Sequence, residues 1–145
     1  MTITIDNGVT ITLTEDQLKE IERQRNPFKS SSDINSYEDA CKILNTTPKK
    51  DPSSRVKVKT IIKAANFLDN NGDVWRENWD NHSQYKYYPI FERKAGGWVV
   101  YCSYYCNYAA VGGFGSYFKE EKTCLLIAKK FLPLYIDYIE NEEIG

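Results

Sequence analysis

The sequence predicts an α+β domain in which an antiparallel meander of three or four strands packs against a C-terminal helix. Two or three short helices and an N-terminal β-hairpin arm complete the expected architecture. Residues 85–118 alternate like strands around glycine-rich turns, residues 124–138 carry an apolar stripe at helical spacing, and a length of 145 residues suits one domain. We expect an arm over residues 1–30 and a compact domain over residues 36–140.

Threonine and apolar residues alternate on both sides of Asp6-Asn7-Gly8, which is the composition of a β-hairpin. A loop of these three residues pairs Ile3 with Ile11 and Ile5 with Val9, and gathers the apolar side chains on one face. A two-residue loop would divide them between both faces. We therefore expect the longer loop, in a ribbon that must dock on the domain or on another subunit because two strands alone are marginal in water.

A capping box formed by Thr14 and Gln17 starts a helix that should run to about Arg25. The apolar stripe of this helix is narrow, so it should anchor weakly. Residues 26–35 are rich in serine and asparagine and are interpreted as a linker. These features together define the expected arm.

Two helices should follow the linker. Ser36 and Asp39 form the cap of a short helix that ends near Asn45 and buries Cys41. A longer helix is predicted over residues 55–68, where apolar residues recur at helical spacing.

Residues 49–63 contain six basic side chains and a single acid, Asp51. Lys59 and Lys63 lie on one side of the predicted helix. Two interpretations stay open, a solvated helix face and a surface that contacts phosphate groups.

The predicted sheet begins with strands at residues 85–93 and 98–106, joined by a turn at residues 95–97. A third strand should follow Gly112-Gly113-Phe114-Gly115. Both faces carry aromatic residues, so a helix must cover one of them. Simple alternation places Trp98, Val100, Cys102 and Tyr104 on one face and Val99, Tyr101 and Tyr105 on the other.

The last helix is the expected cover of this sheet. Glu120 and Glu121 suit the positive end of its dipole, and Pro133 should bend it. A second apolar row widens the buried arc, so this helix should contact two surfaces, and the second could belong to a partner. The first stripe contains Cys124, Ile127, Ala128, Phe131, Tyr135 and Tyr138, and the second contains Leu125, Leu132, Ile136 and Ile139.

Composition excludes some classes of function. A net charge of -1 gives no general attraction to nucleic acid or to acidic membranes. The N-terminus lacks the pattern of a secretory leader, and no segment is apolar enough to span a membrane, so we expect a cytoplasmic protein without membrane contact. The cysteines Cys41, Cys102, Cys106 and Cys124 are then expected to be reduced thiols that pack as small hydrophobes.

Motifs for catalysis and metal binding are weak. Asp69, Asn71, Asp73 and Asp80 match four ligand positions of a calcium loop, but Val74 stands where that loop needs glycine. A helix C-terminal turn at residues 70–72 explains these residues better. Cys102 and Cys106 lack zinc-ligand spacing, and His82 is the only histidine. We expect no enzyme, no metal and no cofactor.

The aromatic tract is the strongest remaining signal, because eight of the eleven tyrosines lie between residues 75 and 118. Stacked aromatics on a sheet can hold single-stranded nucleic acid, and tyrosine and tryptophan also anchor protein interfaces. Cross-strand packing alone would explain many of them. The candidate binding residues are Trp75, Trp79, Tyr85, Tyr87, Tyr88, Tyr101, Lys59 and Lys63.

A series of motifs occupies residues 36–44, 57–66, 79–80 and 84–89, followed by Phe91, Phe118, Lys119, Phe131 and Tyr135. The order of these motifs resembles an uncharacterised family of small proteins from tailed phages and prophages of gut anaerobes. The resemblance covers residues 36–139, and neither the hairpin arm nor the turn at residues 66–76 belongs to it. It implies a virion component, an assembly factor or an inhibitor of a host protein, located in the host cytoplasm or the virion.

Overall fold

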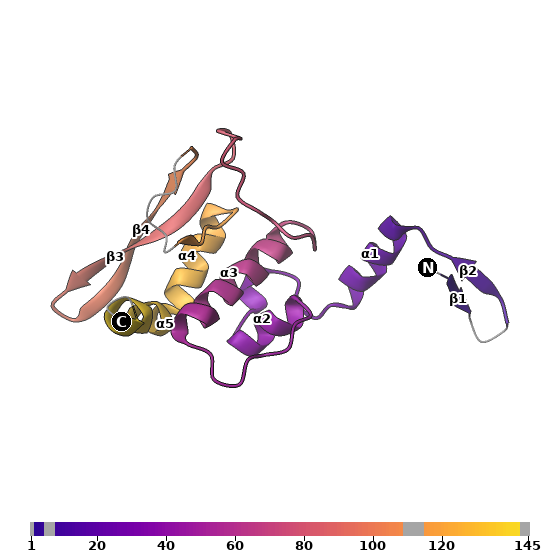
Figure 1. Ribbon diagram of the computed structural model, residues 1–145, viewed down its shortest axis with the longest axis horizontal. Coiled ribbons are helices and arrows are strands. Elements are labelled where there is room, and N and C mark those ends of the chain that lie inside the picture. The colour runs from indigo at the N-terminus through magenta and orange to yellow at the C-terminus, as the bar shows by residue number, and fades with distance from the viewer. Residues whose placement is uncertain (1, 5–7, 109–114, 143–145) are drawn as a thin grey trace.

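The computed structural model describes residues 2–4, 8–108 and 115–142 and has the predicted α+β class (Figure 1). Its strands are β1 (Thr2–Thr4), β2 (Thr10–Thr12), β3 (Lys86–Lys94) and β4 (Gly97–Cys106). Its α-helices are α1 (Glu15–Arg25), α2 (Tyr37–Ile43), α3 (Ser54–Asp69), α4 (Glu121–Lys130) and α5 (Leu132–Asp137). A 3-10 turn, η1 (Ser31–Asp33), precedes α2, and a π-helix, η3 (Tyr138–Glu142), follows α5.

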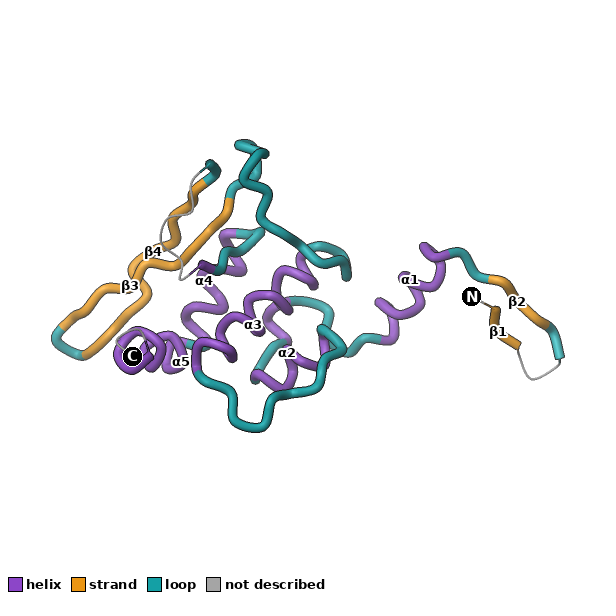
Figure 2. Tube along the Cα trace, viewed as in Figure 1, coloured by secondary structure: helices purple, strands orange, loops and turns teal. Residues whose placement is uncertain are grey.

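The elements form layers, with the arm at one end. The β3–β4 ribbon packs on α4 and α5, and α3 and α2 lie on the side of these helices that faces away from the ribbon (Figures 1 and 2). Helix α1 and the β1–β2 hairpin extend from the opposite end of the molecule (Figure 2). The core lies between the layers and contains Ile34, Ala40, Ile43, Val58, Ile61, Ile62, Ala64, Ala65, Phe118, Cys124, Ile127, Ala128, Phe131 and Tyr135.

The structure of the arm confirms the predicted capping box and the predicted strand pairing. Thr14 and Gln17 form the expected capping box, with reciprocal backbone to side-chain bonds of 3.0 and 3.1 Å. Ile3 pairs with Ile11, as the three-residue loop requires, and the left-handed φ of +80° at Gly8 suits that loop. The expected pairing of Ile5 lies outside the described residues.

The linker prediction for residues 26–35 is wrong in its second half. Ile34 is fully buried, and Ser31 is nearly so. The Asp33 carboxylate accepts the backbone N–H groups of Lys29 and Ser30 at 2.8 and 3.0 Å, which lowers its pKa. These polar residues build a turn by satisfying the backbone locally, so their polarity did not mean flexibility.

The α2 and α3 predictions are confirmed. Ser36 accepts the N–H of Asp39 at 3.1 Å at the start of α2, and Cys41 is buried there. Helix α3 ends in the expected turn, where Asn71 has a left-handed φ of 57° and the N–H of Gly72 donates to the carbonyl of Phe67 at 2.9 Å.

The sheet has fewer strands than the predicted meander. Strands β3 and β4 pair as expected, but the third strand is reduced to one bridge, in which Phe118 exchanges both backbone bonds with Tyr87. The buried side-chain amide of Asn66 bonds the backbone groups on either side of Phe118. It donates to the Tyr117 carbonyl at 2.8 Å and accepts the Lys119 N–H at 2.9 Å. A helix side chain therefore occupies the place of a further strand. The expected start of the third strand at Gly112 lies outside the described residues.

The prediction for the two faces of β4 is also wrong. A register shift between Ile90 and Phe91 leaves Tyr101 as an extra residue on β4, because Ile90 pairs with Cys102 and Phe91 with Val100. Such a bulge reverses the alternation beyond it. Val100 accordingly packs on the core and does not share the face of Cys102.

The C-terminal helix is broken and not merely bent. Helix α4 ends at Lys130, Phe131 leaves helical geometry at φ −108° and ψ 26°, and α5 begins with Leu132 and Pro133. Proline lacks an N–H and crowds the preceding turn, so a new helix begins where the old one ends. The first predicted stripe is nevertheless buried, and the second row is half-buried.

Asp69 leads to a prediction on pH dependence. Burial raises the pKa of its carboxyl above the ordinary value of 3.8, and its Oδ2 atom has no hydrogen-bond partner. The folded state thus holds this proton more tightly than the unfolded chain, so the free energy of unfolding should fall as pH rises from about 4 through the raised pKa. We expect Asp69→Asn to remove this slope in urea titrations. The exposed Asp51→Asn is the control, and an unchanged slope in Asp69→Asn would refute the assignment.

Candidate functional site

The aromatic residues of the sheet join into one contiguous group, the aromatic cluster. It is defined by Trp79, Tyr85, Tyr87, Tyr88, Tyr104, Tyr105 and Tyr117. Tyr85 stacks on Tyr105 with ring centroids 4.6 Å apart, and Tyr105 lies nearly parallel to Tyr104 at 5.8 Å. Tyr88 links this exposed part to Tyr117 and Trp79 through edge contacts.

The exposed part of the cluster is held in place before any partner binds. Tyr85, Tyr104 and Tyr105 keep 45%, 58% and 46% of their surface accessible although their rings contact one another. Cross-strand pairing fixes their positions, since Tyr105 lies opposite Tyr87 and Tyr104 opposite Tyr88. Such a surface offers large apolar area at a small cost in side-chain entropy.

The phenols of Tyr87, Tyr88 and Tyr117 stay neutral at physiological pH. Burial raises the pKa of Tyr87 and of Tyr88, and it raises that of Tyr117 to about 12. The carboxylates of Glu121 and Glu120 also raise the pKa of Tyr87. These tyrosines are therefore suited to packing and hydrogen bonding and not to acting as phenolate nucleophiles or bases.

A buried lysine, which the sequence analysis did not single out, fixes the loop that carries Trp79. Lys86 is 0% exposed, and its ammonium donates to the carbonyls of Gln84, Asn107 and Asn81 at 2.8, 3.0 and 3.3 Å. It also lies 4.8 Å from the centre of a Trp79 ring, a cation–π distance. The ammonium thus ties the loop before β3 to the segment after β4.

Four of the predicted binding residues belong to the aromatic cluster and four do not. Trp75 lies half-buried in the loop between α3 and β3, and Tyr101, at the bulge, is 66% exposed. Lys59 and Lys63 lie on α3, and α4 stands between this helix and the sheet (Figure 1). The basic helix and the exposed tyrosines therefore do not form one surface.

The sequence analysis missed Tyr104, Tyr105 and Tyr117 as members of the cluster. Tyr104 and Tyr105 are neighbours in the chain, and alternation assigns them to opposite faces. Their rings nevertheless stack on each other near the end of β4. The register set by the turn, in which Lys94 pairs with Gly97, would place Ser103 opposite Tyr88, and only the bulge brings Tyr104 there. The local pattern therefore carries no signal that identifies Tyr104.

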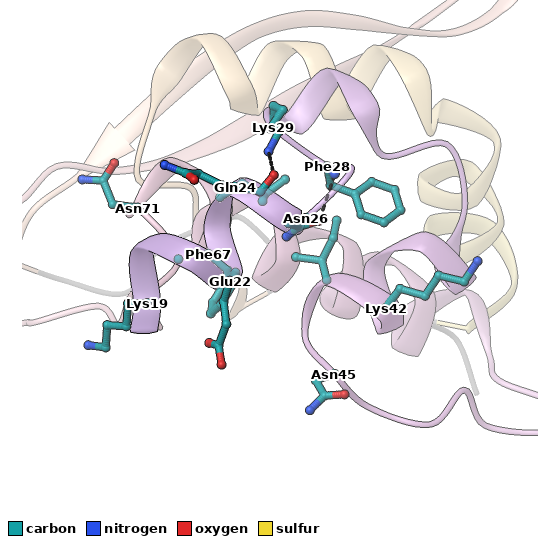
Figure 3. A pocket seen from close by; sticks show the side chains of 13 residues that line it. Lys19, Glu22, Gln24, Asn26, Phe28, Lys29, Lys42, Asn45, Phe67 and Asn71 are labelled. Carbon is teal, nitrogen blue, oxygen red and sulfur yellow. Dashed lines mark hydrogen bonds between the residues drawn. The ribbon is translucent and has the colours of Figure 1, made fainter. Parts of the chain in front are cut away.

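A groove of about 640 Å³ separates α1 from the domain (Figure 3). Phe28, Ile43, Phe67 and Leu68 provide its apolar lining. Polar groups along it already have partners: Lys19 lies 3.2 Å from Asp73, and Lys29 donates to the Gln24 carbonyl at 3.0 Å. The groove resembles a packing seam between arm and domain more than a site for chemistry.

The candidates for metal binding and catalysis are dispersed. Cys41, Cys106 and Cys124 are buried free thiols, and burial raises the pKa of Cys124 to about 12. His82 lies in an exposed loop 6.0 Å from the Tyr108 ring. Among the described residues, no three His, Cys, Asp or Glu side chains are grouped as a metal site would require. In the same part of the chain, no helix is long and apolar enough to cross a bilayer.

Comparison with known proteins gives no relative. Neither a protein-family model, nor a curated protein, nor a solved structure matches the chain significantly. The resemblance to small phage proteins accordingly remains an expectation from the sequence.

Proposed function

We propose that the chain is a non-enzymatic, phage-type protein that acts through protein–protein contacts, as a virion or assembly component. The observation that carries this proposal is the exposure of five tyrosines, between 45% and 72% accessible, of which Tyr85, Tyr105 and Tyr104 stack on one another. The five are Tyr85, Tyr101, Tyr104, Tyr105 and Tyr108. Tyrosine is enriched at interface anchors because one ring supplies both apolar area and a hydroxyl.

The charges beside these tyrosines favour a protein partner over a nucleic acid. The carboxylates of Glu121 and Glu120 act on Tyr87, which contacts Tyr85 and Tyr105. Glu120 is paired with Lys119 at 3.0 Å, so Glu121 is the carboxylate that would disfavour a phosphate group there. Single-strand binders instead line their stacking platforms with basic residues. The basic residue inside the cluster, Lys86, is fully buried and bonded to carbonyls.

The arm supports self-association. Ile11 keeps 43% of its surface exposed on the hairpin, and the hairpin projects away from the domain (Figure 1). Two strands alone are marginal in water, so a docking partner would stabilise them. Among the described residues, the members of the core lie between Ile34 and Tyr135, and Phe28 is the first residue that packs against them. This core therefore draws on none of the arm residues that the structure describes before Asn26.

We expect removal of residues 1–25 to abolish self-association while leaving the far-ultraviolet circular dichroism of the domain intact. Size-exclusion chromatography with light scattering gives the molar mass in solution of the full chain and of the shortened chain. The ratio of absorbance at 260 and 280 nm reports bound nucleic acid. The full chain should elute as an oligomer with a protein-like ratio. An oligomer that persists without the arm would refute the role of the arm.

Two other results would favour different functions. A monomer that carries nucleic acid removable by salt would support a single-stranded nucleic-acid-binding module. A monomer free of nucleic acid would direct attention to an inhibitor of a host protein, which needs no self-association.

A further inference from the structure

We infer that the outer edge of β4 is the docking site for the β1–β2 hairpin of a second copy of this chain, so that copies associate head to tail by strand addition. The inference deepens the proposed assembly function and rests on it. It names the surface that receives the arm and the chemistry by which it does so.

The backbone of β4 offers hydrogen-bonding groups on its outer side. Tyr87 turns its N–H and C=O toward Phe118, at 3.0 and 2.8 Å, and therefore away from β4. Because these orientations alternate along an antiparallel pair, the partners opposite Tyr87 and Pro89, which are Tyr105 and Ser103, turn their own groups away from β3. Among the described residues, no strand pairs with β4 on that side.

The edge lacks the features that usually protect an open strand. Gly97–Cys106 contains neither a charged residue nor a proline, although both are common on exposed edges. The bulge at Tyr101 divides the edge, so the stretch available for regular pairing is residues 102–106. Ser103 and Tyr105 together present two N–H and two C=O groups there, which suits a partner strand of about three residues.

The hairpin has the dimensions and chemistry of such a partner. Each of its strands, Thr2–Thr4 and Thr10–Thr12, is three residues long and uncharged. Among the described elements, each of these strands makes its substantial contacts only with the other. Threonine beside tyrosine on neighbouring strands is a favourable combination in sheets. Pairing would extend a marginal two-stranded ribbon and cover the β4 edge in one step.

The docking must occur between molecules. The hairpin and the β3–β4 ribbon lie at opposite ends of the chain's longest dimension, with α1 and the helical layers between them (Figure 1). A contact between two different surfaces is heterologous, so it forms a ring when the rotation closes and a filament when it does not. Both results suit a protein that assembles.

A complementation experiment tests the inference with two defective chains. Ser103→Pro removes an outward N–H and places a ring on the edge; Pro89, directly opposite, shows that this pair of positions tolerates proline without loss of a β3–β4 bond. Ser103→Thr keeps the N–H and is the matched control. Tyr104→Lys, at an exposed position beside the edge, blocks pairing by charge and serves if proline disturbs the fold. The second defective chain lacks residues 1–25.

Light scattering should show that the full chain and Ser103→Thr assemble, and that each defective chain alone is monomeric at the same concentration. Mixing Ser103→Pro with the arm-less chain should give a complex of one copy of each. Ser103→Pro still supplies an intact arm, and the arm-less chain still supplies an open β4 edge. Circular dichroism checks that each variant is folded.

The other outcomes overturn the inference in distinguishable ways. If the arm-less chain is monomeric but Ser103→Pro and Tyr104→Lys still assemble, the arm docks elsewhere and only the proposed assembly function survives. An arm-less chain that forms a dimer sensitive to Ser103→Pro would show pairing of β4 with β4. A mixture that stays monomeric refutes head-to-tail docking, and a monomeric full chain refutes both proposals.

Discussion

Replacing Lys86 by methionine is expected to lower the free energy of unfolding by about 3 kcal/mol or more, the largest effect of any single substitution considered. Methionine keeps the length of the apolar stem but removes the ammonium. The carbonyls of Gln84, Asn107 and Asn81 then lose their common donor. The Asn81 carbonyl keeps a second donor, the Gln84 N–H at 3.1 Å, so the loss falls on the part-buried carbonyls of Gln84 and Asn107. An acceptor left without a donor costs about 1–3 kcal/mol, and the cation–π contact with Trp79 is lost as well.

Urea denaturation gives this difference directly, and hydrogen exchange of residues 78–84 should show faster opening of the loop that Lys86 holds. Lys94→Met is the matched control on the same strand, because the Lys94 side chain is 61% exposed and its nearest carboxylate, on Glu92, lies 3.9 Å away. That control should change stability by less than about 0.5 kcal/mol. A loss below about 1 kcal/mol for Lys86→Met would mean that water replaces the ammonium.

Asn66→Leu is expected to have the second largest effect, a loss of about 2–4 kcal/mol in the free energy of unfolding. Leucine has a similar size but cannot donate to the Tyr117 carbonyl or accept the Lys119 N–H. Asn66 is 4% exposed, so water has little access to these groups. The bridge between Phe118 and Tyr87 should weaken, because Asn66 holds the backbone on both sides of Phe118.

Thermal and urea unfolding measure the loss, and the amide of Phe118 should exchange faster with solvent. Asn35→Leu is the matched control, since Asn35 is exposed and its amide donates to the Asp33 carbonyl at 3.3 Å. Equal stability of Asn66→Leu and Asn35→Leu would show that the Asn66 bridge contributes nothing to the fold.

The candidate site was predictable in part. The sequence identified Tyr85, Tyr87 and Tyr88 because strand-forming composition and a turn place them on a sheet. It could not identify Tyr104, because membership of the cluster depends on which residue lies opposite Tyr88. It wrongly joined Lys63 to this surface, since separation by α4 is a property of packing and leaves no trace in the local pattern.

Local elements were determined by the sequence because their signals act within a few residues. The capping box of Thr14 and Gln17, the cap at Ser36 and the turn after Asp69 all satisfy backbone groups through neighbours in the chain. The apolar stripe of the C-terminal segment likewise reports which face is buried, although it does not show that Pro133 ends one helix and starts another.

Only the tertiary structure decided features that join distant residues. Asn66 and Tyr117 are 51 residues apart, and their hydrogen bond satisfies a backbone carbonyl on the side of this segment that faces away from β3. Lys86 and Asn107 are 21 apart, and their bond buries a charge that composition alone would place in solvent. The physical reason is common to both: a buried polar group takes whichever partner the packed layers bring to it, and the sequence pattern reports only whether a side chain is polar.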